Sequence, residues 1–256
     1  MIYTSYEMIR DCRANQPAGW RYLVRQYVPV VRRVLAHYGA QTVAEPVLKA
    51  LGAPQSALFG SLEPVPERPF VLALRQSILA EIEEVAPAMD LGLDQLTAAL
   101  DGFTLVEKQV VWLEGMRYSP DETGEMLRMA GSTVEKIRGR AAERVRGQVD
   151  GWSSRLVAEN GRALGQAAKE RRGDKCVDSK TFLDVVDGRM TWQGREQVEQ
   201  HVPGCWYCID HFCRVAEVVE LLRGLQPLTE AEATPFDRLL GIPEERRGGW
   251  RKWFGG

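Results

Sequence analysis

Hydrophobic residues recur at the spacing of amphipathic helices along most of the chain. The clearest stretch is residues 19–38, whose apolar positions, with charges between them, are Leu23, Tyr27, Val30, Val31, Val34, Leu35 and Tyr38. Residues 44–51 and 70–85 have the same character, and Pro87 follows the second of these stretches. Residues 52–69 contain four prolines, which predicts a connection without regular structure.

The helical pattern becomes denser after Leu91 and breaks into four short segments. They cover residues 91–103, 104–116, 119–129 and 132–149, and the last three begin with Thr104, Ser119 and Ser132. Ser and Thr are favoured helix N-caps, and a glutamate three residues after Thr104 and after Ser119 completes the capping-box pattern. No segment alternates apolar and polar residues convincingly, as a strand would. We therefore predict an all-α protein.

Composition divides the chain after residues 90, 151, 175 and 226. Residues 1–90 and 91–151 are the two helical regions, and residues 152–175 are polar and charge-rich, which favours a helical linker that frays into solvent. Residues 176–226 contain a Cys/His cluster. Residues 227–256 are interpreted as an unanchored tail, although its aromatic residues could dock into a groove. These aromatic residues are Trp250, Trp253 and Phe254.

The charge and the N-terminus limit where the chain is expected to work. A net charge of −2 argues against a uniformly basic surface, so any contact with nucleic acid must come from a local patch. The first residues do not have the pattern of a signal peptide, and no apolar run approaches the ~20 residues of a membrane span. We expect a cytoplasmic protein without a membrane partner. Because thiols stay reduced in the cytoplasm, clustered Cys and His residues there favour a metal site or a redox pair over a disulfide.

Residues 119–146 have the layout of a helix-turn-helix. A capped helix is followed by a turn at Ala130 and Gly131 and then by a second capped helix. The apolar residues expected to lock the two helices together are Leu127, Met129, Val134 and Ile137. The second helix carries Lys136, Arg138, Arg140, Arg144 and Arg146 against Glu135 and Glu143. Such a basic excess suits phosphate neutralisation, while the alternative is a solvated, arginine-rich helix face.

Residues 119–141 resemble region 4 of the extracytoplasmic-function sigma factors. The matching residues are Ser119, Glu122, Leu127, Thr133, Val134, Arg140 and Ala141. The resemblance implies that the helix starting at Ser132 reads the −35 promoter element. The DNA-binding residues would be Ser132, Thr133, Lys136, Arg138, Arg140 and Arg144. Thr123 and Gly124 replace the Ile-Ala pair that is usual in the family, and Glu135 stands where a basic residue is common.

The N-terminal region resembles sigma region 2 in a degenerate form. Residues 20–38 are similar to the first helix of that region, and residues 68–84 are similar to its last. The resemblance implies RNA polymerase core as a partner. The acidic stretch that contacts the core in the family is missing, and Glu45 is its one plausible remnant.

Four residues near the C-terminal end of the chain have the spacing of a zinc site. His201, Cys205 and Cys208 follow one another at His-x3-Cys-x2-Cys, and Pro203 and Gly204 allow a turn between a helix ending at His201 and another starting near Cys205. Structural zinc takes four N or S ligands, and Cys176 supplies the fourth. Residues 176–225 resemble the zinc-binding anti-sigma domain, whose pattern also includes Asp187, Gly188 and Met190. We predict a Zn²⁺ ion bound by Cys176, His201, Cys205 and Cys208.

Other interpretations of these Cys and His residues stay open. Cys205 and Cys208 could form a redox pair, or the thiols could be buried together by accident. His211 could substitute as a ligand. Cys213 is either an ordinary buried thiol or a redox residue that attacks an oxidised zinc ligand. Cys12, in an apolar helix, is expected in the core.

The two resemblances together imply an extracytoplasmic-function sigma factor with an anti-sigma-like zinc domain fused behind it. Its partners would be promoter DNA, RNA polymerase core and, through an intramolecular contact, its own zinc domain. A first alternative is a sigma-like DNA-binding regulator that does not bind core polymerase. A second is a zinc-dependent protein-interaction module. We expect no enzyme, because the sequence has no catalytic motif and four-ligand zinc leaves no open coordination position.

Overall fold

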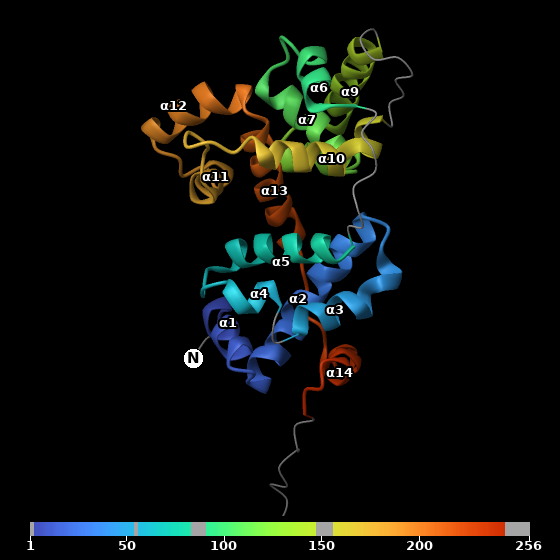
Figure 1. Ribbon diagram of the computed structural model, residues 1–256, viewed down its shortest axis with the longest axis vertical. Coiled ribbons are helices and arrows are strands. Elements are labelled where there is room, and N and C mark those ends of the chain that lie inside the picture. Colours follow the sequence, from blue (N-terminus) through green and yellow to red (C-terminus); the bar gives the residue numbers. More distant parts are fainter. Residues whose placement is uncertain (1–2, 54–55, 83–90, 147–155, 244–256) are drawn as a thin grey trace, which may run out of the picture. The chain divides into compact units, whose positions relative to one another are not determined.

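The computed structural model describes residues 3–53, 56–82, 91–146 and 156–243. Every regular element within these ranges is a helix, which confirms the predicted all-α class (Figure 1). The chain forms two compact units. The first contains residues 1–36, 40–82 and 224–256, and the second contains residues 37–39 and 83–223. None of the described helices is both long enough and apolar enough to cross a membrane.

The first unit is built around the long helix α2. Its elements are α1 (Ser5–Arg13), α2 (Pro17–His37), the 3-10 turn η1 (Gln41–Val43), α3 (Ala44–Gly52), α4 (Ala57–Ser61), α5 (Glu67–Ile82) and α14 (Glu230–Leu239). The apolar stripe predicted for α2 is buried from Leu23 to Leu35, and Cys12 of α1 is a core residue as predicted. The proline-rich connection nevertheless contains the short α4, because the Ser56 side chain accepts a hydrogen bond from the Phe59 amide and caps its first turn.

Helix α14 corrects the interpretation of residues 227–256 as an unanchored tail. A capping box starts the helix: the Thr229 amide donates to Glu232 Oε2 over 2.9 Å, and the Glu232 amide donates to Thr229 Oγ1 over 3.4 Å. Leu240, just after the helix, helps to line an apolar pocket with residues of α2, α3 and α5. The Phe236 ring lies 4.8 Å from the Arg32 guanidinium. Apolar docking against the first unit therefore fixes this segment. The aromatic residues Trp250, Trp253 and Phe254 lie outside the described residues.

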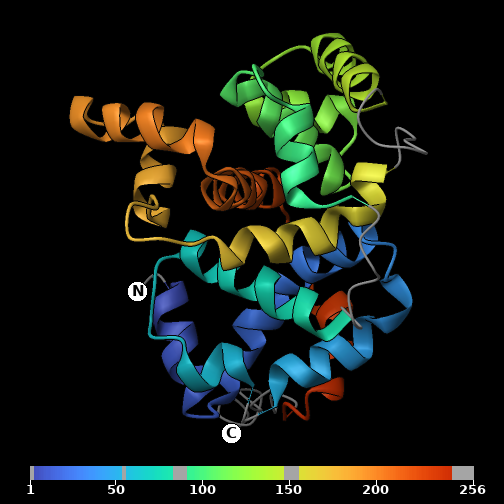
Figure 2. The same ribbon diagram turned by 45° about the horizontal axis from the view of Figure 1, so that its top comes forward.

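The second unit combines the helix-turn-helix region and the Cys/His region. Its elements are α6 (Leu93–Ala99), α7 (Leu105–Gly115), α8 (Pro120–Leu127), α9 (Gly131–Arg146), α10 (Leu156–Glu170), α11 (Ser179–Val186), α12 (Trp192–His201), the 3-10 turn η2 (Val202–Gly204) and α13 (Trp206–Leu222). Helix α13 packs against α7, α8, α10 and α11. Figure 2 shows α13 nearly end-on, with α11 and α12 on one side and α6 and α7 on the other. The segments assigned above to residues 91–151 and 176–226 thus share one compact unit.

Helices α8 and α9 form the predicted helix-turn-helix. The buried Val110, Val134 and Ile137 make its core, and Leu127 and Met129 pack against them, which confirms the apolar contacts predicted from the sequence. Both predicted capping boxes are present, at Thr104 of α7 and at Ser119 of α8.

The turn between α8 and α9 is tight because Gly124 and Gly131 allow neighbouring atoms to approach the backbone closely. Arg128 ends α8 in the left-handed region, at φ 56°, and the Met129 amide donates to Gly124 O over 2.8 Å. A Cβ at Gly124 would lie 2.6 Å from Met129 O, so glycine is the residue that allows this turn without a shift of the backbone. Helix α9 begins at Gly131 and not at Ser132, because the Val134 amide already donates to Ala130 O. The expected N-cap role of Ser132 is therefore wrong.

Helix α10 (Leu156–Glu170) confirms that residues 152–175 contain a helix followed by an exposed segment, but it corrects their interpretation as a linker. The helix packs against α7, and it buries Val157, Leu164 and Ala168. Gly161 of α10 lies directly on Gly115 of α7, so that a Cβ at Gly161 would lie 1.9 Å from Gly115 O. The polar composition of this segment conceals a narrow apolar stripe, which is sufficient to bury one side of a helix.

Candidate metal centre and DNA-binding helix

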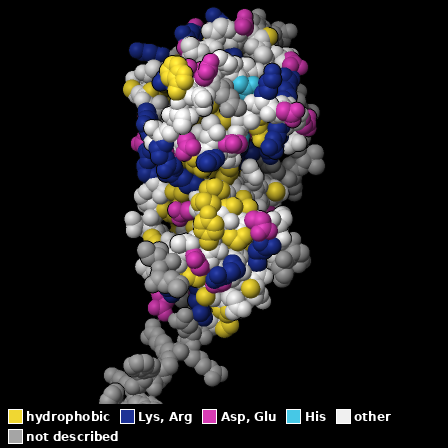
Figure 3. Space-filling view, turned by 90° about the vertical axis from the view of Figure 1, so that its left-hand side faces the viewer, with side chains coloured by type: hydrophobic (Ala, Val, Ile, Leu, Met, Phe, Trp, Pro, Cys, Tyr) yellow, Lys and Arg dark blue, Asp and Glu magenta, His cyan; other side chains and the backbone are white. Residues whose placement is uncertain are grey.

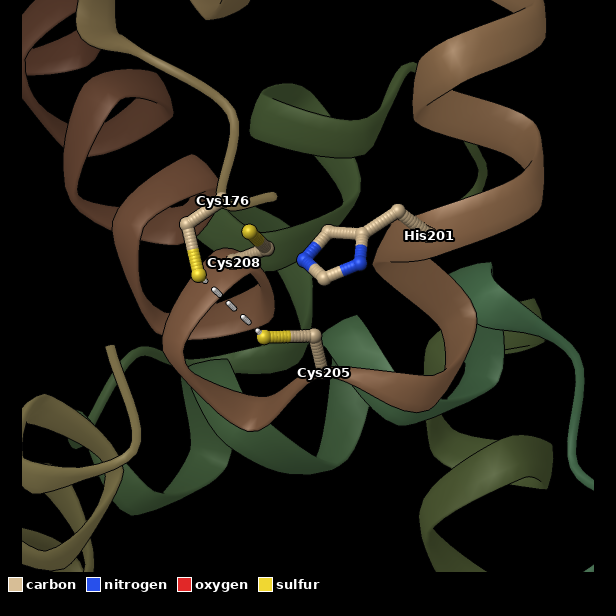
Figure 4. Close-up of side chains that lie close together, drawn as sticks. All are labelled: Cys176, His201, Cys205 and Cys208. Atoms are coloured by element: carbon tan, nitrogen blue, oxygen red, sulfur yellow. Dashed lines mark hydrogen bonds between the residues drawn. The ribbon is translucent and has the colours of Figure 1, made fainter. Parts of the chain in front are cut away.

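The side chains of Cys176, His201, Cys205 and Cys208 point toward a common centre (Figure 4). Their ligand atoms all lie within 4.8 Å of one another. His201 is the last residue of α12, Cys205 is the N-cap of α13, and Cys208 lies in the first turn of α13. Cys176 comes from the loop between α10 and α11. The sequence spacing therefore identified four residues that are positioned to hold a metal ion.

Local backbone geometry brings the four ligands together. Pro203 is in the first turn of η2, and the Cys205 amide donates to Val202 O over 3.1 Å, which reverses the chain between α12 and α13. Beside this turn, the loop after α10 is closed by the Cys176 amide, which donates to Gly173 O over 3.0 Å. The predicted positions of the end of α12 and the start of α13 are both confirmed.

Distances and hydrogen bonds within the cluster fit a tetrahedral thiolate-imidazole site. The sulfurs of Cys176 and Cys205 are 3.8 Å apart, and a tetrahedron with ~2.3 Å Zn–S bonds has edges of about 3.8 Å. Amides donate to two of the sulfurs: Gly173 N to Cys176 Sγ and Val177 N to Cys208 Sγ, both over 3.3 Å. His201 Nε2 is buried without a hydrogen-bond partner among the described residues. An unpartnered buried imidazole nitrogen is what a metal ligand requires.

Burial makes uncompensated thiolates in the cluster unfavourable, a cost that a bound cation would offset. Burial raises the pKa of Cys205 and Cys208, although the backbone amides of Cys208 and Val177, respectively, act in the opposite direction. A cation between the sulfurs offsets the cost of burial, because it stabilises the thiolate form. Four protein ligands close the coordination sphere, so the site suits a structural ion.

His211 and Cys213 lie outside the cluster. His211 Nε2 lies 2.8 Å from Ser179 Oγ, and its ring packs against Phe182, so this histidine holds α11 on α13. Cys213 is fully buried, and its Sγ points toward Gln109 O of α7 at 4.0 Å. Burial raises the pKa of Cys213 far above the usual value, which keeps it an unreactive thiol. The structure therefore favours the ordinary buried thiol over the redox role.

The residues expected to bind DNA separate into an exposed group and one internal residue. Ser132, Thr133 and Lys136 are exposed on α9. Arg140 and Arg144 are exposed as well, and their guanidinium groups lie 5.1 and 5.3 Å from the Phe103 ring centroid.

Arg138 points inward instead, and its side chain is only 15% exposed. Its Nη2 donates to Tyr118 O over 2.7 Å and to Thr123 Oγ1 over 3.1 Å. The side chain thus ties α9 to α8, and Thr123 supplies one of its acceptors. Arg138 is not on the exposed face with the other five residues, because it lies beside the buried stripe of α9.

Sequence reasoning missed a buried polar interface between α13 and residues 112–118, which end α7 and lead into α8. Trp112 Nε1 donates to Asp210 Oδ1 over 3.1 Å, and Asp210 also pairs with Arg214 over 2.8 Å. Tyr118 donates to Glu217 Oε1 over 2.5 Å. One sequence signal could have revealed it: Asp210 and Glu217 are seven residues apart in a mostly apolar helix, so they lie on one face, and buried carboxylates require partners.

The face drawn in Figure 3 shows no separation of charge. Figure 3 shows basic, acidic and hydrophobic side chains interspersed there, which agrees with the small net charge. No protein-family model, no curated protein and no solved structure matches this chain.

Proposed function

We propose that this chain is an extracytoplasmic-function-type sigma factor that is regulated in cis by a zinc-binding anti-sigma-like domain. The observation that carries the proposal is the presence of two features in one compact unit. These are a helix-turn-helix with an exposed polar and basic helix α9, and a Cys3His cluster positioned to hold a metal ion. The sequence resemblances to sigma region 4 and to the anti-sigma domain support the same assignment.

Helix α9 is the element that would enter the major groove at the −35 promoter element. Ser132, Thr133 and Lys136 lie at its N-terminal end, where the recognition helix of such motifs meets base edges. Arg140 and Arg144 lie further along α9, beside Phe103, and suit contacts to phosphate.

The first unit is the region proposed to contact RNA polymerase core. Helix α3 stands where the family has its acidic contact stretch, and Glu45 is exposed in the first turn of this helix. The contact surface of this chain is therefore less acidic than that of the family.

The Cys3His residues would hold Zn²⁺, which supplies a structural cross-link between the α10–α11 loop and the start of α13. Helix α13 packs on α7 and α8, while Ser132, Thr133 and Lys136 of α9 stay exposed. We therefore propose that the zinc domain acts through packing on the helix-turn-helix and not by covering its reading residues. Because the zinc domain and the sigma-like part are in one chain, each meets the other at a roughly millimolar effective concentration. Even weak packing between them would therefore hold the sigma-like part in a closed state. Loss or oxidation of the zinc ligands shifts this equilibrium to an open state, in the reducing cytoplasm where we place the protein.

Two matched substitutions in α9 test the DNA-binding role. Lys136→Gln removes an exposed cation, so we expect weaker binding to promoter DNA and a decrease of about 1 in the salt dependence of binding. Arg138→Gln removes an internal tie, so we expect loss of stability, with an unchanged salt dependence in the folded fraction. Unchanged DNA binding by the Lys136→Gln variant, or no DNA binding by the parent chain, would contradict the role.

The second candidate function is a sigma-like DNA-binding regulator that does not engage core polymerase. It is favoured by one observation, the replacement of the acidic stretch by α3. A pull-down with purified core polymerase separates the two, because only the sigma factor retains the polymerase. If the chain binds neither DNA nor polymerase, the zinc-dependent protein-interaction module is the function that remains.

A further inference from the structure

The loop between the metal ligands is itself the surface that contacts the helix-turn-helix region. We call residues 201–208 the metal loop. Trp206 lies between the ligands Cys205 and Cys208, and it is only 5% exposed. Its ring stacks on Trp112 of α7 with centroids 5.1 Å apart and planes 27° apart. Its Nε1 donates to Thr97 Oγ1 of α6 over 2.6 Å. A residue inside the ligand set is thus locked to two helices of the helix-turn-helix region.

A second contact holds the other half of the metal loop. Lys108 Nζ of α7 donates to Pro203 O over 2.9 Å, and Pro203 lies in the turn that separates His201 from Cys205. The contacts at Pro203 and at Trp206 thus lie before and after Cys205 in the sequence. Because all three α6–α7 side chains come from rigid helices, they fix the backbone from which His201, Cys205 and Cys208 project.

The metal cluster holds the same loop through a second set of contacts. The Val177 amide bonds to Cys208 Sγ, and Cys176 Sγ lies 3.8 Å from Cys205 Sγ. A bound ion would join these groups and also satisfy His201 Nε2, which is buried and has no partner among the described residues. Ligands brought together from separate segments make metal binding part of the folding free energy.

We propose that metal binding and the packing of α6–α7 are coupled through the metal loop, with Thr97, Lys108 and Trp112 as positioning residues for the metal ligands. The coupling is reciprocal: if bound metal strengthens the packing of α7, contacts from α7 strengthen metal retention by the same factor. The biological meaning rests on the proposed function, since α7 also carries the core of the helix-turn-helix at Val110. Loss of the metal would thereby weaken the packing of α7 and, through α7, affect the DNA-binding region. It would not need to move α9 directly.

Zinc release from the full-length chain tests the coupling. The variants Thr97→Val and Lys108→Met each remove one hydrogen bond to the metal loop and retain the volume of the side chain. We expect each to weaken Zn²⁺ retention by about 2- to 10-fold in competition with a colorimetric chelator. Leu127→Ala is the matched control, because Leu127 packs on the core cluster of Val110, Val134 and Ile137. When compared at the same loss of unfolding free energy, the Leu127→Ala variant should retain Zn²⁺ better than the Thr97→Val and Lys108→Met variants.

Hydrogen exchange gives the reciprocal readout. In the parent chain, stripping Zn²⁺ should raise amide exchange in residues 105–115, and the increase should be smaller in the Thr97→Val and Lys108→Met variants. Zinc retention like that of the parent in both variants, or exchange in α7 that is insensitive to Zn²⁺, would overturn the proposal. Neither assay contains DNA or polymerase, so a chain that failed as a sigma factor could still show the coupling, and the reverse also holds.

Discussion

Two glycines one turn apart in α10 give opposite predictions for the same substitution. Gly161→Ala would place a Cβ 1.9 Å from Gly115 O, whereas Gly165→Ala would place it 3.4 Å from Arg214 Nη2, the end of a flexible side chain. Both positions are helical, so the gain in helix propensity from alanine is the same, about 0.5–1 kcal/mol. Only the contact differs.

The size of the effect follows from the required movement. Real Cβ atoms essentially never approach another heavy atom closer than 3.0 Å, so α7 and α10 must separate by at least 3.0 − 1.9 = 1.1 Å at Gly161. A gap of this size forfeits roughly half of the dispersion energy at the contact, and overpacking of this kind costs about 1–3 kcal/mol. After the gain in helix propensity is subtracted, we expect Gly161→Ala to lower the unfolding free energy of the second unit by about 1–2 kcal/mol. Gly165→Ala should leave it equal or raise it by up to ~1 kcal/mol.

Thermal unfolding of the zinc-loaded full-length chain measures the difference. For a unit of this size, each kcal/mol shifts the midpoint by about 2–4 °C. The two variants should therefore move the second unit's transition in opposite directions, or move it only in Gly161→Ala. Equal stabilisation by both substitutions would mean that α10 does not pack on α7, and the linker interpretation of residues 152–175 would then be right.

Four further predictions concern the turn, α14 and the metal. Gly124→Ala should weaken both stability and DNA binding, measured by thermal unfolding and a mobility-shift assay, because the new Cβ meets the backbone oxygen of Met129 at 2.6 Å. Leu240→Ala should lower the unfolding midpoint of the first unit, with a loss of about 1–3 kcal/mol for this half-buried residue, and leave the second unit's transition in place. The Thr229 amide and hydroxyl lower the pKa of Glu232 below its ordinary value of 4.5, so its contribution to α14 is present above pH 4.5 and is lost as pH falls through the lowered value. The protection of the α14 amides, taken as the ratio of intrinsic to observed exchange rate at each pH, should therefore fall with acid, and less so in Glu232→Gln. Removal of Zn²⁺ by a chelator should lower the midpoint of the second unit's transition in calorimetry and leave the first unit's unchanged.

Features set by local chemistry were predictable from the sequence. The capping boxes at Thr104 and Ser119 depend on residues three positions apart, and both are present. The Cys3His cluster was also predictable, because three of its ligands lie within eight residues and a fourth was required.

Features set by packing between distant segments were not predictable in the same way. Helix α14 is held by α2 and α3, more than 175 residues earlier in the chain, and no local pattern in residues 227–243 reveals those partners. Arg138 is a different case. It lies four residues after Val134 and three before Ala141, which are both buried, so the helical period of α9 already placed it beside the core. Its charge and its position in the helix that resembles a recognition helix suggested the DNA-facing role, and the periodicity argued against it.

Transcription with purified bacterial core polymerase tests the central proposal most directly. The measurement is promoter-dependent transcript yield from a template library with randomised −35 elements, with the zinc-loaded chain and with its His201→Ala variant. The proposal predicts transcripts that depend on the chain, enrichment of a defined −35 sequence, and a higher yield with the His201→Ala variant, in which the metal centre is incomplete. The absence of chain-dependent transcripts from both proteins would contradict the sigma-factor assignment, and equal yields would contradict regulation by the metal centre.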